Sequence, residues 1–224
     1  MGSVGAGGRA LPVHTPYVGG MQSYTAVVLA GGRGRRLGGP AKPAVAVAGR
    51  PMLGRVLAAV AGATARVVVG PPELAPLVPA GVSLVLEEPP GGGPVAALAA
   101  GLAAIPADAS RLVLLAADLP LLSVPAVDRL LHAVGGFDGA VYVDGAGRRQ
   151  WLCGAWHVVA LRDRLAGLAG PAAGSSLRDL FGPLRVTDVS GPAGEPPPWY
   201  DCDTPAEVVE AERLSGGDAL GGSA

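Results

Sequence analysis

The feature that most constrains this chain is a segment rich in glycine and arginine, placed directly after an apolar run. Residues 24–30 (YTAVVLA) are β-branched and aliphatic, which predicts a buried strand, and residues 29–39 (LAGGRGRRLGG) continue from it. Ligands of open α/β sheets bind beyond the carboxyl ends of strands. Glycines there let backbone N–H groups approach phosphate oxygens, and guanidinium groups add bidentate contacts. We therefore predict an anion-binding loop, although a tight solvated turn is the ordinary alternative in a glycine-rich chain.

Two common phosphate-binding loops do not match this segment. A Walker A loop ends in Gly-Lys-Ser/Thr, whereas Lys42 follows Ala41 and precedes a proline. A dinucleotide-binding GxGxxG motif beginning at Gly32 has Leu37 where its third glycine belongs. Both classes are therefore excluded.

Lys42 is the only lysine of the chain, whose other 16 basic residues are arginines. A compact ammonium can neutralise a phosphate oxygen as a point charge in a narrow site, which a guanidinium does less well. We predict that Lys42 acts together with the glycine loop. The alternative is an ordinary surface lysine.

Apolar runs and helical patterns alternate along most of the chain. Strands are predicted at 24–30, 66–69, 82–86, 111–116, 140–143, 151–159 and 184–189, and helices at 51–61, 94–105, 125–134 and 205–214. This order predicts a Rossmann-like, three-layer α/β fold with a mostly parallel sheet. We expect one domain over residues 24–214, with a disordered leader at 1–23 and a disordered tail at 215–224.

Composition limits the partners and the compartment. The formal net charge is −1, so no basic field favours nucleic acid or an anionic membrane. No apolar run is long enough to span a membrane, and the N-terminal residues lack the apolar core of a signal peptide. Two cysteines do not make a disulfide framework or a zinc site. We therefore expect a cytoplasmic protein that binds neither nucleic acid nor membrane.

Acidic residues at two places are candidate metal ligands. Asp118 follows the apolar run 111–117, where a carboxylate at the mouth of a buried strand suits Mg²⁺, although aspartate is also common in turns before proline. Asp201 and Asp203 precede Thr204-Pro205, and Thr204 with Glu207 predicts a helix capping box. Asp203 is the stronger functional candidate of the pair, with a purely capping role as the alternative.

Three of these segments resemble a known family. LAGGRGRRLGGPAK (29–42) resembles the nucleotide-binding signature of the molybdenum cofactor guanylyltransferases and of their sugar-phosphate nucleotidyltransferase relatives. ADLPLL (117–122) is similar to the family's acidic motif, and DCDTP (201–205) to its N-x-[ND]-T-P motif. The sequence departs from the cofactor branch at Ala41, where that branch usually has aspartate.

The resemblance implies roles for particular residues. Arg36, Lys42 and Asp118 would be catalytic, and Asp118 and Asp203 would hold Mg²⁺. The acidic loop before residues 91–94 (GGGP) would lie near the base and ribose. The residues that would bind the nucleotide are Leu29, Ala30, Gly31, Gly32, Lys42, Glu88 and Asp118.

The same resemblance predicts a reaction. It is transfer of GMP from GTP to molybdopterin, with release of pyrophosphate. A cytidylyltransferase or sugar-phosphate nucleotidyltransferase, with another NTP and another phosphorylated acceptor, is the first alternative. A nucleotide-binding protein without catalytic activity is the second.

Overall fold

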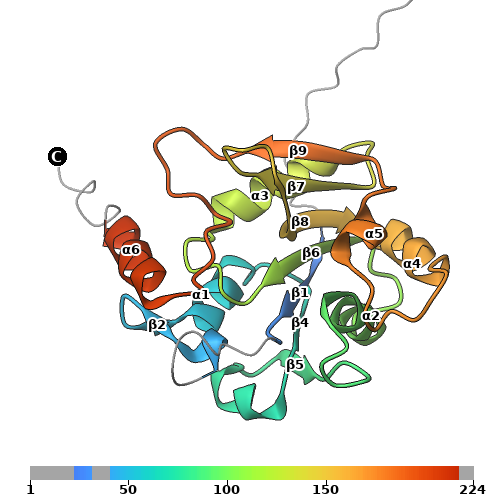
Figure 1. The fold of residues 1–224 in the computed structure, drawn as a ribbon, viewed down its shortest axis with the longest axis horizontal. Coiled ribbons are helices and arrows are strands. Elements are labelled where there is room, and N and C mark those ends of the chain that lie inside the picture. The colour runs from blue at the N-terminus through green and yellow to red at the C-terminus, as the bar shows by residue number, and fades with distance from the viewer. Residues whose placement is uncertain (1–22, 32–40, 217–224) are drawn as a thin grey trace, which may run out of the picture.

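The computed structural model describes residues 23–31 and 41–216 of the chain. These residues form a seven-stranded sheet in the order β5-β4-β1-β6-β8-β7-β9 (Figure 1). The strands are β1 (Thr25–Leu29), β4 (Ala65–Val69), β5 (Val82–Val85), β6 (Arg111–Ala116), β7 (Gly139–Val143), β8 (Arg149–His157) and β9 (Val186–Ser190). Neighbouring strands pair in parallel except at β8, which is antiparallel to β6 and to β7. The predicted three-layer α/β fold with a mostly parallel sheet is confirmed.

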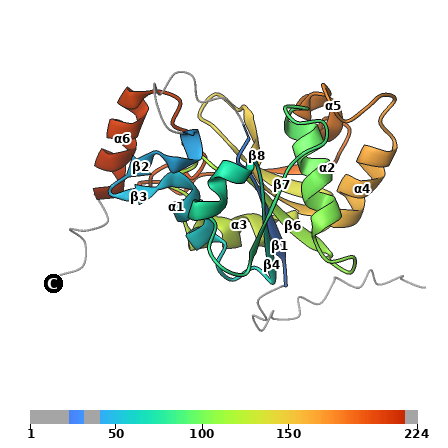
Figure 2. The same cartoon turned by 90° about the horizontal axis from the view of Figure 1, so that it is seen from below.

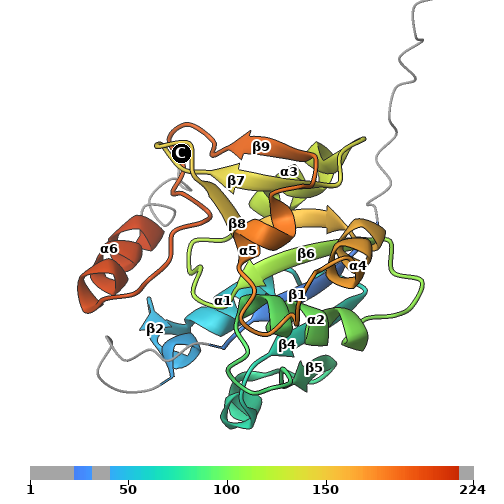
Figure 3. The same ribbon diagram turned by 45° about the vertical axis from the view of Figure 1, so that its right-hand side comes forward.

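Helices cover both faces of this sheet (Figure 2). The helices are α1 (Met52–Ala59), α2 (Pro94–Ala104), α3 (Val124–Val134), α4 (Val158–Ala166), α5 (Leu177–Phe181) and α6 (Pro205–Ser215). One core cluster joins β1 to α1 and α3, and a second joins β1 to α2, α4 and α5. Figure 3 shows these last three helices together on their side of the sheet. Strand β1 is buried along its whole length, as expected of a central parallel strand whose residues are nearly all apolar.

Close packing of α2 on the sheet depends on a glycine. Gly101 is buried, and a Cβ added there would lie 2.5 Å from Cγ1 of Val27 and 3.3 Å from Cγ2 of Val69. No side chain fits in this space without displacing its neighbours. The helix therefore lies close against β1 and β4, and its N-terminus is fixed beside their carboxyl ends.

Shorter elements lie near the carboxyl ends of the central strands (Figure 1). They are the 3₁₀ helices η1 (Lys42–Ala44) and η2 (Pro72–Leu77), and the two-stranded hairpin of β2 (Ala46–Val47) and β3 (Arg50–Pro51). The hairpin and α6 share a small core of Val47, Met52, Cys202 and Ala211. The sequence patterns did not predict η1, η2 or the β2–β3 hairpin, whereas α6 was predicted at 205–214.

The strand predicted over residues 151–159 was wrong at its end. It stops at His157, and Val158 and Val159 begin α4. Both valines are β-branched, which favours a strand, but Val158 and Leu161 face the core while Val159 is 64% exposed. Tertiary packing of that helical face overrides the local preference. Helix α5 was also missed, because five residues are too few to show a helical period.

Parts of the predicted domain organisation lie outside the described residues. Only Ser23 of the expected leader and residues 215 and 216 of the expected tail are described. Within the described part of the chain, none of the helices has the length and apolar character that crossing a bilayer requires.

Candidate active site

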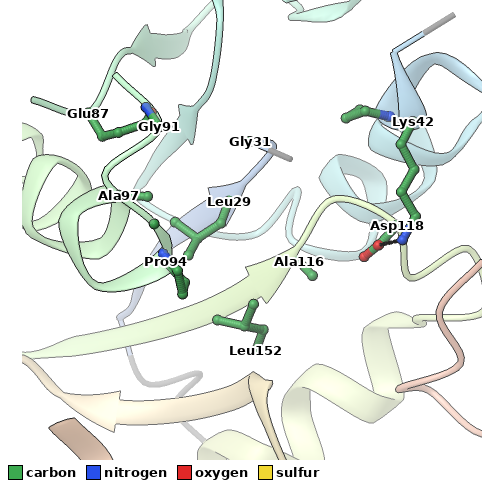
Figure 4. A pocket seen from close by; sticks show the side chains of 12 residues that line it. Leu29, Gly31, Lys42, Glu87, Gly91, Pro94, Ala97, Ala116, Asp118 and Leu152 are labelled. Atoms are coloured by element: carbon green, nitrogen blue, oxygen red, sulfur yellow. Dashed lines mark hydrogen bonds and ion pairs between the residues drawn. The ribbon is translucent and has the colours of Figure 1, made fainter. Parts of the chain in front are cut away.

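A pocket of about 460 Å³ opens at the carboxyl ends of the central strands (Figure 4). Gly31 follows β1, Glu87 follows β5 and Asp118 follows β6, so the topology brings these three residues to one edge of the sheet. Lys42 and Pro43 of η1 and the N-terminal residues of α2 complete the wall. The full lining is Leu29, Gly31, Lys42, Pro43, Glu87, Gly91, Gly93, Pro94, Ala97, Ala116, Asp118 and Leu152.

Lys42 lies between two carboxylates at one side of this pocket. Its Nζ forms an ion pair with Oδ2 of Asp118 and lies 2.5 Å from Oδ1 of Asp203. The side chains of Lys42 and Asp118 are only 16% and 17% exposed. Burial opposes the charged ammonium, but the hydrogen bonds and charges of the two aspartates outweigh it and raise the pKa of Lys42. Lys42 is therefore positively charged at neutral pH, and its side chain is mostly buried, unlike that of an ordinary surface lysine.

Asp118, Asp201 and Asp203 form an acidic cluster around this lysine. One carboxylate oxygen from each lies within 4.8 Å of the other two. Oδ1 of Asp118 is buried without a hydrogen-bond partner. Burial and the charge of Asp118 raise the pKa of Asp201, so the two carboxyl groups interact electrostatically. Oxygen ligands from a few carboxylates are what a small divalent cation requires, and the cluster fits such an ion.

The segment that carries Asp201 and Asp203 is anchored by the start of α6. Thr204 is the N-cap of this helix, and the predicted capping box with Glu207 is confirmed. Oε2 of Glu207 accepts hydrogen bonds from the backbone N–H groups of Asp203 and Thr204, both at 2.7 Å. Capping fixes the backbone of Asp203, while its side chain turns to Lys42. The metal-binding role expected of Asp203 stays a prediction.

The acidic loop after β5 presents Glu87, not Glu88, to the pocket. Glu87 is 7% exposed, and its Oε1 accepts a hydrogen bond of 3.0 Å from the backbone N–H of Gly91. Its Oε2 is buried without a partner. Glu88 is exposed and does not line the pocket. Reading the sequence alone missed Glu87, although as the first carboxylate beyond β5 it matches Asp118, the first carboxylate beyond β6.

A second pocket, of about 300 Å³, adjoins the first. The two share Ala116, Asp118 and Leu152, so Asp118 stands at their junction. The second pocket is otherwise lined by Leu119, Arg149, Gln150, Trp151, Cys153, Leu177, Trp199 and Asp201. It therefore combines two tryptophans with one guanidinium and one amide.

Hydrogen bonds orient the polar groups of this second pocket. Nε of Arg149 donates to Oδ1 of Asp188 at 2.6 Å, and the guanidinium lies 5.5 Å from the ring centre of Trp151. The Gln150 amide donates to Asp144 and to the carbonyl of Arg148, both at 3.3 Å. The polar edge of the pocket is thus held in one arrangement.

The predicted site residues are only partly brought together. Leu29, Gly31, Lys42 and Asp118 line the first pocket. Ala30 is 3% exposed within the core and its backbone N–H donates to Val69, so its side chain does not line the pocket. Gly32 and Arg36 lie outside the described residues.

Comparison with known proteins agrees with this fold. The MobA-like NTP transferase domain matches residues 26–186. A molybdenum cofactor guanylyltransferase of Bradyrhizobium sp. (strain ORS 278) is 30% identical over 205 residues, which cover 84% of this chain and 92% of that protein.

Two solved structures share the fold. Molybdopterin-guanine dinucleotide biosynthesis protein A of Archaeoglobus fulgidus superposes with a TM-score of 0.66 at 21% identity, over 86% of this chain and 99% of that chain. The 2-C-methyl-D-erythritol 4-phosphate cytidylyltransferase of Thermus thermophilus has a TM-score of 0.61 at 22% identity, over 87% and 99%.

The sheet, the pocket beyond its carboxyl edge and these matches together define a nucleotidyltransferase. The chain belongs to the family of MobA-like NTP transferases.

Proposed function

We propose that this nucleotidyltransferase transfers GMP from GTP to the phosphate of molybdopterin and releases pyrophosphate. The positions of Asp118 and Lys42 support this proposal. Both line the larger pocket, and Asp118 also lines the smaller one. A reacting phosphorus beside Asp118 would be reachable from both pockets. The 30% identical relative, named as a molybdenum cofactor guanylyltransferase, favours this donor and acceptor.

The triphosphate would lie along β1 and η1. Gly31 and Gly32 would offer backbone N–H groups, and Arg36 and Lys42 would neutralise phosphate oxygens. An oxygen of the acceptor phosphate would attack the α-phosphorus, and the bond from that phosphorus to the pyrophosphate oxygen would break. This chemistry needs no nucleophilic side chain, because alignment of the reactants and stabilisation of charge supply the catalysis.

Mg²⁺ is the metal we propose for the acidic cluster. Asp118 and Asp203 would hold it, with Asp201 as the third carboxylate within reach. When bound, the ion would neutralise the charge that develops on the phosphate oxygens. The buried, unpartnered Oδ1 of Asp118 supports this assignment, because an unsatisfied carboxylate oxygen is costly without a cation or donor.

Glu87 supports guanine as the base. The guanine ring has two adjacent donors, the N1–H and the exocyclic N2 amine, and an ionised carboxylate only accepts hydrogen bonds. The buried carboxylate of Glu87 lines the pocket at the end of β5, and two strands separate β5 from β6, which carries Asp118 at its end. The base of an extended nucleotide would lie at this far end of the pocket. We assign the base-contacting role expected of Glu88 to Glu87.

The smaller pocket suits an acceptor with a flat heterocycle and a phosphate. Trp151 and Trp199 offer aromatic surface, and Arg149 and Gln150 offer polar groups at its edge. Molybdopterin has both features.

The test is pyrophosphate release by the full chain with Mg²⁺, molybdopterin and each NTP in turn. We expect release with GTP to exceed release with ATP, CTP or UTP at least tenfold. Equal or faster release with CTP would place the activity with the cytidylyltransferases. If the protein binds nucleotide but releases no pyrophosphate with every one of several phosphorylated acceptors, it is a non-catalytic binding protein.

A further inference from the structure

The ammonium of Lys42 lies where the acidic cluster would hold a cation. Its Nζ contacts carboxylate oxygens of both Asp118 and Asp203, and those residues and Asp201 are the whole of the cluster. One ammonium thus pairs with two of the three carboxylates. In the close view, the lysine side chain extends from η1 along one side of the pocket and ends at Asp118 (Figure 4).

We propose that Lys42 and the divalent cation compete for Asp118 and Asp203, so that the metal binds tightly only when a triphosphate draws Lys42 away. This inference rests on the proposed function, because it requires a metal and a triphosphate at the same site. It adds a second role for Lys42: beyond contacting phosphate, the residue would keep the metal site closed until the nucleotide arrives.

The competition follows from the geometry of the oxygens. A Mg²⁺ ion binds carboxylate oxygens at about 2.1 Å in a near-octahedral arrangement. An ammonium has no lone pair and cannot be a ligand, so it has to be a rival for the same oxygens. Since Lys42 already bonds to two of the three carboxylates, an ion placed between them would lie against its positive charge.

A new position for the ammonium is available nearby. Lys42 lines the larger pocket, and its four-carbon chain is flexible enough to turn from the carboxylates to a phosphate group. The phosphates of a bound nucleotide would replace the carboxylates as its partners and release the metal site. Metal and nucleotide would then each strengthen binding of the other by the same factor.

The experiment measures Mn²⁺ binding to the full chain by electron paramagnetic resonance, first without nucleotide. We expect Lys42→Met to bind Mn²⁺ at least tenfold more tightly than the unmodified protein. Lys42→Arg keeps the charge and should leave the affinity low. Arg50→Met, which removes an exposed positive charge that does not line the pocket, should also leave the affinity unchanged.

The second part adds the α,β-methylene analogue of GTP, which cannot be cleaved at the α-phosphorus. It should tighten Mn²⁺ binding to the unmodified protein at least tenfold, and should have a smaller effect on Lys42→Met. Equal or weaker Mn²⁺ binding by a folded Lys42→Met variant would overturn the proposal. If that variant does not fold, the Lys42→Arg variant provides the test. The proposal would be overturned if Lys42→Arg without nucleotide bound Mn²⁺ as tightly as the unmodified protein does with the analogue.

Failure of the proposed competition and failure of the proposed function give different results in this experiment. If the CTP analogue tightens Mn²⁺ binding as much as the GTP analogue, the guanylyl assignment fails while the competition stands. If neither analogue has an effect but Lys42→Met still binds Mn²⁺ more tightly, the competition stands and its release by nucleotide is overturned.

Discussion

Lys42 and Asp203 are 161 positions apart in the sequence, yet Nζ of the lysine lies 2.5 Å from Oδ1 of the aspartate. One residue opens η1 after the glycine-rich segment, and the other precedes the N-cap of α6. Their contact joins the two ends of the domain at the edge of the larger pocket. The ammonium pairs with both this carboxylate and that of Asp118. Removal of one charge from such a partly buried group is destabilising, because the remaining charges lose their compensation.

Replacement of Lys42 should weaken nucleotide binding. Lys42→Ala removes the cation and should raise the Kd for GTP at least tenfold, because a phosphate loses its point charge. Lys42→Arg should restore binding only in part, since the planar guanidinium is larger than the ammonium. Isothermal titration calorimetry measures both. Unchanged Kd values in the two variants would show that Lys42 does not contact the nucleotide.

Asp118→Asn should abolish Mg²⁺-dependent turnover while the fold survives. Asparagine keeps the shape of the side chain but removes the charge that a metal requires. We expect at least a 100-fold fall in the rate of pyrophosphate release, with a thermal unfolding curve that remains cooperative. Asp163→Asn, at an exposed position on α4, is the matched control. Full activity in Asp118→Asn would rule out the metal assignment.

Glu87→Gln should change which purine the pocket prefers. The amide offers one donor and one acceptor, which match the N1–H and the O2 carbonyl of xanthine better than the two donors of guanine. We expect GTP to bind at least tenfold more weakly, and XTP more tightly than in the unmodified protein.

Glu73→Gln, an exposed acid on η2, controls for the loss of charge in that experiment. A general loss of binding for every nucleotide would indicate a structural role for Glu87. The same purine switch in Glu88→Gln, and not in Glu87→Gln, would return the base-contacting role to Glu88.

Gly101→Ala should destabilise the fold, although alanine is normally the better helix former. The new Cβ would meet Val27 at 2.5 Å, and overpacking of this kind costs about 1–3 kcal/mol of unfolding free energy. Gly54→Ala in α1 is a matched control, because its nearest neighbour would lie at an ordinary 3.7 Å. The control should gain up to about 1 kcal/mol. Urea unfolding gives both values, and equal gains would contradict the close packing of α2.

Much of the fold was predictable because the sheet consists of continuous apolar runs. The apolar runs of β1 and β6 show no helical pattern that would compete with a strand. Two residues beyond each strand lies a residue that lines the pocket, Gly31 after β1 and Asp118 after β6. The helices α4 and α5 were not predictable, since one begins with two valines and the other has five residues. Local preference carries no information about the tertiary contacts that decide such cases.

The site was predictable in its residue types more than in its geometry. Lys42 and Asp118 stood out through their positions after the glycine loop and after a buried strand. Which of the two adjacent glutamates enters the pocket depends on the turn that follows. Gly91 there has φ of 77°, in the left-handed region, and donates its N–H to Glu87. The sequence pattern does not specify that turn.

Transfer of the α-phosphate tests the proposed reaction most directly. The full chain is incubated with Mg²⁺, molybdopterin and GTP labelled at the α-phosphate, and the products are separated by chromatography. We expect label in a molybdopterin–guanine dinucleotide, with one pyrophosphate released per product and no label transferred by Asp118→Asn. Label that remains in GTP or appears only as free GMP, under conditions in which GTP is bound, would contradict it.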